Sequence, residues 1–442
     1  MRRPPARLTP SHPFSLVLWL TVVLGALGFA PLAAQDPAAA SDAPLPSGLP
    51  QLARRIEQRQ PVRVVCLGDS VTGVYYHTGG LRAYPELLAD HLRHRWPDST
   101  VEVVNAGISG NTTADGLARL DRDVLAHQPH VVTIQFGLND MARVPPETFR
   151  ANLTTLVQRC RDAHAEVVLC TPNGILDPRV RGGGGRSVEA LEQFASLTRA
   201  LARELGVPVC DLLAGYQSVA RQAPRRFRWL MSDQIHPNLD GHRLNAAELA
   251  RVLCGPSWPG DPFEPPTLPA PTALARTRQK VAQGQPVRVL AMAPVGEAVV
   301  AALRRHSGAS PVELTTWEVA GQTLPQIEAA SARVRKEGPY DLVVVALPHA
   351  ALPAQEPTEA DVWSGSWVLN NSLAFGRREW DVLVVAPSLD TTPLTADSAA
   401  REEFLRRLAH AQDLPFIARP ASLATAPAAD AWAAWFLQHW GE

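Results

Sequence analysis

The chain has 442 residues, more than one ordinary domain contains and enough for two domains that each bury a hydrophobic core. Its 42 basic and 43 acidic side chains give a formal net charge of −1. This balance provides no overall electrostatic attraction to nucleic acid or to an anionic membrane, so we expect neither as a partner.

The amino terminus has the pattern of an export signal. Three arginines within the first seven residues precede an apolar stretch from Phe14 to Ala30, and small residues follow as far as Ala34. The pattern resembles a secretory signal peptide over residues 1–34, which predicts a secreted or periplasmic protein. An uncleaved amino-terminal anchor is the alternative, because the apolar stretch approaches the length that spans a bilayer.

After a linker at 35–50, strand-like and helical patterns alternate. Apolar runs predict strands at Val62–Leu67, Val101–Asn105, Val131–Phe136, Glu166–Thr171 and Val207–Asp211. Helical spacing of apolar residues predicts helices at Tyr84–Arg95, Gly116–Ala126, Pro146–Ala163, Ser187–Leu205 and Asp240–Leu253. The alternation predicts a parallel sheet covered on both faces, and therefore a three-layer α/β/α domain over residues 51–255.

The second half repeats the first in outline. A proline-rich linker is predicted at 256–280, because neither a helix nor a central strand accepts so many prolines. Beyond it, Gln285–Val289 repeats Gln60–Val64 residue for residue. Further strand-like runs lie at Tyr340–Ala346, Trp380–Ala386 and Leu414–Ala418. We therefore predict a second, similar α/β domain at 281–442.

The five cysteines all lie in the first half of the chain. Cys66, Cys170 and Cys210 fall within strand-like runs, where a small apolar core residue is the simpler interpretation. A disulfide between Cys160 and Cys254 stays open. The chain has no C-x-x-C pair, so we expect neither a zinc ribbon nor a redox motif.

Ser70 is the strongest candidate for chemistry. It follows the first predicted strand within Gly68-Asp69-Ser70-Val71, at the sheet edge where open α/β sheets bind ligands. A serine hydroxyl attacks a carbonyl only when a base accepts its proton and donors stabilise the oxyanion.

Three further loops carry such groups. Asn105–Thr112 follows the second predicted strand with two glycines, and Asn139 follows the third. Asp233 and His236 stand three residues apart before the last predicted helix. Taken singly, each motif is typical of an ordinary turn or helix cap, which is our interpretation of Asp69 and Asp140. Together they favour a catalytic site.

These four separated motifs, in this order over residues 60–254, resemble the SGNH hydrolases, also called the GDSL esterase/lipase family. The resemblance implies a flavodoxin-like fold and a metal-independent, cofactor-independent serine esterase that works through an acyl-enzyme. It implies Ser70 as nucleophile, His236 as base and Asp233 as its partner. The implied oxyanion hole consists of the Ser70 and Gly110 N–H groups and the Asn139 side chain.

The expected substrate is a small-molecule or glycan ester, with carbohydrate deacetylation as one option and lipase or thioesterase activity as others. An acyltransferase acting on a sugar hydroxyl and a glycan-binding protein with a relic site stay open as alternatives. The second domain lacks the motifs, since Ala293, Pro294 and Val295 align with Gly68, Asp69 and Ser70. It resembles a degenerate, non-catalytic copy of the first.

Several other features have simpler explanations. Arg179–Arg186 is glycine-rich but lacks the strand and Lys-Ser/Thr of a phosphate loop, so we interpret it as a mobile loop near the site. Four arginines precede Asp233, namely Arg221, Arg225, Arg226 and Arg228. We interpret them as a solvated loop, with attraction of an acidic substrate as the alternative. Tyr75, Tyr76 and His77 fit either a substrate cleft or core packing.

Overall fold

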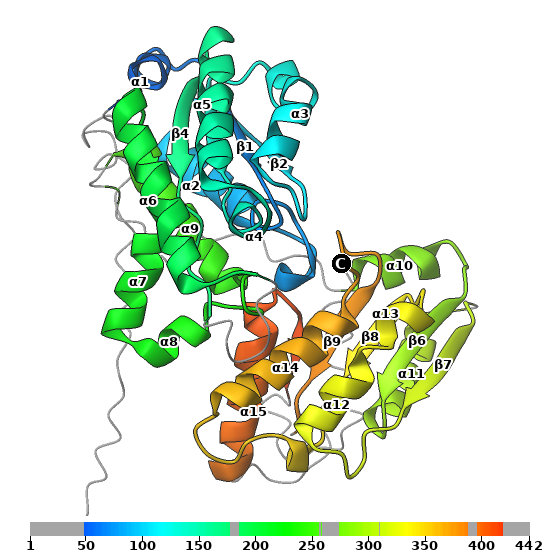
Figure 1. The fold of residues 1–442 in the computed structure, drawn as a ribbon. Coiled ribbons are helices and arrows are strands. Elements are labelled where there is room, and N and C mark those ends of the chain that lie inside the picture. Colours follow the sequence, from blue (N-terminus) through cyan, green and yellow to red (C-terminus); the bar gives the residue numbers. More distant parts are fainter. Residues whose placement is uncertain are drawn as a thin grey trace, which may run out of the picture. The chain divides into compact units, whose positions relative to one another are not determined.

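Two five-stranded parallel sheets form the framework of the protein (Figure 1). The structure is a computed structural model that describes residues 48–176, 185–255, 258, 274–308, 310–387 and 396–418. The predicted export signal lies outside these residues. Within them, every helix is too short or too polar to cross a bilayer.

The first sheet has the order β2-β1-β3-β4-β5. Its strands are β1 (Val62–Gly68), β2 (Val101–Gly107), β3 (Val131–Gln135), β4 (Glu166–Cys170) and β5 (Val209–Cys210). Gly68 at the end of β1 pairs with Gly107 of β2 and with Gln135 of β3. Because these three neighbouring strands end at one level, the loops that follow them leave from the same edge of the sheet.

Helices cover both faces of this sheet (Figure 1). The helices of this part are α1 (Pro50–Glu57), α2 (Tyr84–Arg95), α3 (Thr113–Asp123), α4 (Asp140–Arg143), α5 (Pro146–Asp162), α6 (Val188–Leu205), α7 (Leu212–Gln222), α8 (Pro224–Arg228) and α9 (Leu239–Cys254), with 3₁₀ turns η2 (Tyr76–Thr78) and η3 (Leu125–His127). One apolar cluster joins the sheet to α1, α2 and α9, and another joins it to α3, α5 and α6. Strands with a core on each face read as near-continuous apolar runs, which is why the sequence predicts them well.

The second sheet has the order β10-β9-β8-β6-β7. Its strands are β6 (Val287–Met292), β7 (Val312–Trp317), β8 (Leu342–Val345), β9 (Asp381–Val385) and β10 (Phe416–Ile417). Its helices are α10 (Ala275–Ala282), α11 (Val295–His306), α12 (Leu324–Ser331), α13 (Val334–Glu337), α14 (Glu359–Ser372) and α15 (Ala396–Ala411), with the 3₁₀ turn η5 (His349–Ala351). When β6 is matched to β1, the two sheets have the same strand order.

The α/β class and the parallel sheet are confirmed, and the differences are local. The strand β7 is missing from the sequence-based assignment because it is an edge strand whose middle residues are largely solvent-exposed, so its apolar pattern is weak. Residues 275–280, which the composition predicts as linker, belong to α10. The arginine segment is helical and not a loop, because α7 and α8 occupy most of it. Arg221, Arg225 and Arg226 are exposed as expected, whereas Arg228 is buried. All five cysteines are buried and free, so Cys160 and Cys254 form no disulfide.

Candidate active site

Ser70 occupies a tight turn immediately after β1. The N–H groups of Thr72 and Gly73 both donate to the Asp69 carbonyl oxygen, at 3.2 and 3.0 Å. Gly68 permits this turn, because a Cβ atom at that position would lie 2.0 Å from Thr72 Oγ1 and 2.7 Å from the Gln135 carbonyl oxygen. The turn places the Ser70 side chain at the sheet edge, where it is largely buried.

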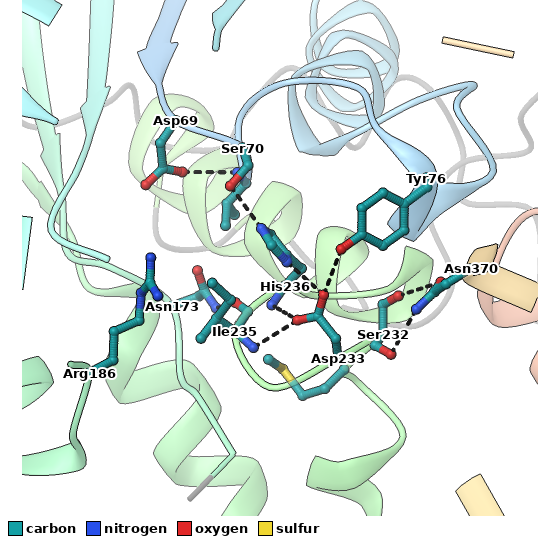
Figure 2. A network of polar contacts seen from close by, with 12 residues as sticks. Asp69, Ser70, Tyr76, Asn173, Arg186, Ser232, Asp233, Ile235, His236 and Asn370 are labelled. Carbon is teal, nitrogen blue, oxygen red and sulfur yellow. Dashed lines mark hydrogen bonds and ion pairs between the residues drawn. The ribbon is translucent and has the colours of Figure 1, made fainter. Parts of the chain in front are cut away.

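Ser70, His236 and Asp233 form one continuous line of hydrogen bonds (Figure 2). The Ser70 Oγ atom lies 2.8 Å from His236 Nε2, and His236 Nδ1 lies 2.8 Å from Asp233 Oδ2. Ser70 and His236 come from loops and are 166 residues apart in the sequence. With its proton on Nδ1, His236 presents a free Nε2 lone pair to the serine hydroxyl, which is the arrangement a general base needs.

Asp233 is buried, and hydrogen bonds compensate for the cost of burying its charge. Its Oδ1 atom accepts from the backbone N–H groups of Ile235 and His236, each at 2.9 Å. Its Oδ2 atom also accepts from the Tyr76 hydroxyl at 3.0 Å. Burial would raise the pKa of Asp233, but the adjacent His236 and these donors lower it below its usual value. The carboxylate therefore stays ionised beside the imidazole.

The contact with Asp233 also changes the pKa of His236. Burial disfavours the imidazolium, but the negative charge of Asp233 and its hydrogen bond raise the pKa of His236 above the ordinary histidine value. The His77 ring stacks on His236 with centroids 4.7 Å apart, and His242 stacks on His77 at 5.5 Å. Burial and the neighbouring His236 keep the pKa of His77 well below normal, so His77 stays neutral. The burial of Tyr76 and His77 supports the packing interpretation.

The Gly110 loop lies against Asn139. Gly110 has φ +78°, which favours glycine, and nothing lies within 4 Å of the position its Cβ atom would take. Arg143 donates to the carbonyl oxygens of both Gly110 and Asn139, and Asn139 Nδ2 donates to the Asn111 carbonyl oxygen at 3.0 Å. The loop after β2 and the loop after β3 are thus held together beside the turn that carries Ser70.

Comparison with known proteins shows the family of this chain. Residues 66–244 match the GDSL-like Lipase/Acylhydrolase family. A protein of Escherichia coli K12, "Thioesterase 1/protease 1/lysophospholipase L1", is 33% identical over 191 residues, which cover 43% of this chain and 82% of that protein. The chain belongs to the GDSL-like lipase/acylhydrolase family.

Acetylxylan esterases are also among the proteins similar to this chain. An acetylxylan esterase of Geobacillus stearothermophilus is 29% identical over 222 residues, covering 44% of this chain and 95% of that protein. A crystal structure of an acetylxylan esterase from the same organism aligns at 26% identity with a TM-score of 0.38, over 45% of this chain and 95% of that one. As a member of this family with esterase relatives, the chain is a hydrolase that acts on ester bonds.

Two arginines of this family member support the site, and the sequence patterns did not single out either role. Arg119 of α3 donates to the carbonyl oxygens of Gly68 and Ala106, both at 2.8 Å, and to Asn111 Oδ1 at 2.7 Å. It therefore joins the ends of β1 and β2 to the Gly110 loop. Because these three acceptors are uncharged and lie at separate positions in the chain, no short motif in the sequence indicates this role of Arg119.

Arg186 controls the orientation of the Asn139 amide. Arg186 Nη2 donates to Asn139 Oδ1 at 2.8 Å, so the amide nitrogen faces the opposite side, toward Asn111 and Asp69 Oδ2 at 3.3 Å. Residues 179–184 of the predicted mobile loop lie outside the described residues. Burial raises the pKa of Asp69 to about 6. Its Oδ1 accepts from the Val71 N–H at 2.9 Å, consistent with the supporting role predicted for Asp69.

The site is built from serine, imidazole, carboxylate and amide groups. Within the described part of the chain, no three His, Cys, Asp or Glu side chains are grouped so that they could hold a metal ion. The structure brings Ser70, Asp233 and His236 together, and it places Gly110 and Asn139 beside them. This arrangement can generate a nucleophilic serine and present N–H donors to a developing oxyanion.

The raised pKa of His236 predicts the pH dependence. Activity needs neutral His236, so kcat/KM should rise with pH through a value above about 6.5, the ordinary histidine pKa. The Asp233→Asn variant should lose about 10³- to 10⁴-fold in kcat, because it removes the carboxylate that fixes the tautomer. Rates on an aryl ester measured from pH 5 to 9 test this. In the Asp69→Asn variant the rise of kcat/KM with pH should persist at a somewhat lower pH, because the Asp69 charge also raises the pKa of His236. Loss of the pH dependence in this variant would assign it to Asp69 instead of His236.

Substitution of Asn139 tests whether its side-chain amide takes part in the oxyanion hole. If its Nδ2 atom stabilises the oxyanion, Asn139→Ala should lower kcat by about 10²- to 10³-fold with a small change in KM. The Asn152→Ala variant is the control, because Asn152 donates to Thr113 away from Ser70. Equal kcat values for the two variants would exclude Asn139 as an oxyanion donor.

Proposed function

We propose that this protein is an exported serine esterase that hydrolyses carboxylic esters through an acyl-enzyme on Ser70. The observation that carries the proposal is the line of 2.8 Å contacts from Ser70 Oγ through His236 to Asp233. Ser70 Oγ attacks the ester carbonyl carbon while His236 Nε2 accepts the hydroxyl proton. Collapse of the tetrahedral intermediate breaks the bond to the alcohol, which leaves with that proton.

Water then completes the cycle. His236 accepts a proton from water, the oxygen attacks the acyl carbon, and the acid leaves as Ser70 regains its proton. Asp233 orients His236 and stabilises the imidazolium. We assign the oxyanion hole to the Ser70 and Gly110 N–H groups and the Asn139 side chain. In the resting state, Asn139 Nδ2 donates to the Asn111 carbonyl oxygen at 3.0 Å and to Asp69 Oδ2 at 3.3 Å. The longer hydrogen bond to Asp69 is the weaker one, so we propose that the oxyanion replaces Asp69 as the acceptor.

We further propose a short acyl group, such as acetyl, on a carbohydrate. The acetylxylan esterase relative supports this substrate class, as does the predicted export signal at residues 1–34. An apolar surface beside the Gly110 loop supports it too. Phe375 is 54% exposed, its ring lies 5.5 Å from that of Tyr75, and the Tyr75 hydroxyl accepts from the Ser109 N–H at 2.7 Å. Exposed aromatic faces suit sugar rings.

The second domain, over 281–442, is in our proposal a degenerate and non-catalytic copy. The matching strand order of the two sheets supports this view. The residues after β6 are Ala293, Pro294 and Val295, in the place that Ser70 and its neighbours take after β1. None of these three side chains can serve as a nucleophile.

A substrate panel with Ser70→Ala as its control tests the proposed function. The panel contains acetylated xylo-oligosaccharides, p-nitrophenyl acetate, p-nitrophenyl palmitate, an acyl-CoA and a lysophospholipid. We expect the highest kcat/KM on acetylated sugars, acetate as product, and loss of at least about 10⁴-fold in Ser70→Ala. Faster turnover of the long-chain esters or the thioester would replace the carbohydrate with a lipid or thioester substrate. Failure of a fluorophosphonate to label Ser70 would end the esterase proposal.

Substitution of the exposed Phe375 tests separately whether this aromatic surface binds the sugar. Phe375→Ala should raise KM for an acetylated xylo-oligosaccharide by about 2- to 10-fold, the loss expected for one aromatic contact. The same variant should keep its kcat/KM on p-nitrophenyl acetate, which is too small to reach the ring. An equal loss on both esters would mean that Phe375 supports the site's structure instead of binding the sugar.

A further inference from the structure

Tyr76 connects the Asp233 carboxylate to the second α/β half of the chain. Its hydroxyl donates to Asp233, while its ring belongs to the apolar core built around the second sheet. The Arg335 guanidinium lies 4.5 Å from the centre of the ring, and the Tyr76 N–H donates to the Phe375 carbonyl oxygen at 3.1 Å. The position of this hydroxyl is therefore set by the second half as much as by the first.

Ser232, the residue before Asp233, is held by the second half directly (Figure 2). Asn370 of α14 donates from Nδ2 to the Ser232 carbonyl oxygen at 3.3 Å, and its Oδ1 atom lies 3.0 Å from the Ser232 hydroxyl. Both residues are at most 1% exposed. A buried polar pair of this kind fixes the backbone of Ser232, because any shift leaves amide or hydroxyl groups without partners.

Gln412, just after α15, bridges the two loops that carry the network. One end of the Gln412 amide group lies 3.2 and 2.7 Å from the carbonyl oxygens of Tyr76 and His77. The other end lies 3.0 Å from the Ser232 hydroxyl oxygen and also contacts Asn370 Oδ1. Gln412 is 2% exposed. One side chain thus sets the separation between the Tyr76 loop and the Asp233 loop.

From these contacts we propose that the second domain positions the catalytic Asp233–His236 loop, with Asn370 and Gln412 as positioning residues and Tyr76 as the connection to the carboxylate. The inference rests on the proposed esterase mechanism. Asp233 and His236 lie on a loop between α8 and α9, and a displacement of about 1 Å in such a group can cost about 10²-fold in rate. In this proposal the second half supports the chemistry of the first through these contacts.

Adjacent asparagines on α14 provide the test. Asn370→Ala removes the contacts to Ser232, whereas the control Asn371→Ala removes a bond to Ser331 within the second half. On p-nitrophenyl acetate, we expect Asn370→Ala and Gln412→Ala to lower kcat by about 10- to 100-fold, with KM changed less than about 3-fold. Fluorophosphonate labelling of Ser70 should slow by the same factor. Asn371→Ala should keep the wild-type kcat.

Tyr76→Phe removes only the hydroxyl, and we expect its kcat to fall by about 10-fold while the ring packing remains. All variants are assayed below their measured melting temperatures, and if Asn370→Ala does not fold, Gln412→Ala and Tyr76→Phe decide the outcome. Wild-type kcat in the folded variants, or equal losses in the Asn370 and Asn371 variants, would overturn the positioning role while the esterase stands. Absence of Ser70-dependent hydrolysis in the wild type would instead overturn the proposed function, and this inference with it.

Discussion

The ionised carboxylate of Asp233 is the constraint on which the rest of the site depends. A buried charge is stable only when hydrogen bonds replace the water it has lost. Four donors reach Asp233: two backbone N–H groups of its own loop, the His236 ring and the Tyr76 hydroxyl. The first three donors lie within three residues of Asp233 in the sequence. The fourth, Tyr76, is 157 residues away. The orientation of His236 is therefore a local property, whereas the position of the whole loop is a tertiary one.

The opposite side of the site depends on strand register. Because β1, β2 and β3 end at Gly68, Gly107 and Gln135 in one aligned row, Ser70, the Gly110 loop and Asn139 leave the sheet together. Arg119 then fixes the first two loops through neutral acceptors, and Arg186 fixes the amide of Asn139. Two buried or half-buried cations close to the oxyanion loops also bring positive potential to the place where negative charge would develop.

The sequence predicts those parts whose signal is local. Buried parallel strands are continuous apolar runs, so β1 to β4 could be placed to within two residues. Ser70, Asn139, Asp233 and His236 follow from short motifs at strand ends and before a helix. The edge strand β7 could not be found this way, because one exposed face weakens its apolar pattern. Arg119, Arg186 and Asn370 could not be found either. Most of their contacts join positions far apart in the chain, and many use backbone carbonyl oxygens, which any residue type supplies.

Tyr76 shows why the two halves of the chain are not independent. Its aromatic ring is a core residue of the second half, yet its hydroxyl ends at the carboxylate of the first. Without the second half, the ring would be exposed to water and the hydroxyl could reach solvent, so the hydrogen bond to Asp233 would compete with bonds to water. A polar side chain and an apolar core thus depend on each other across the chain. This dependence gives a physical reason for the two halves to remain joined in one chain.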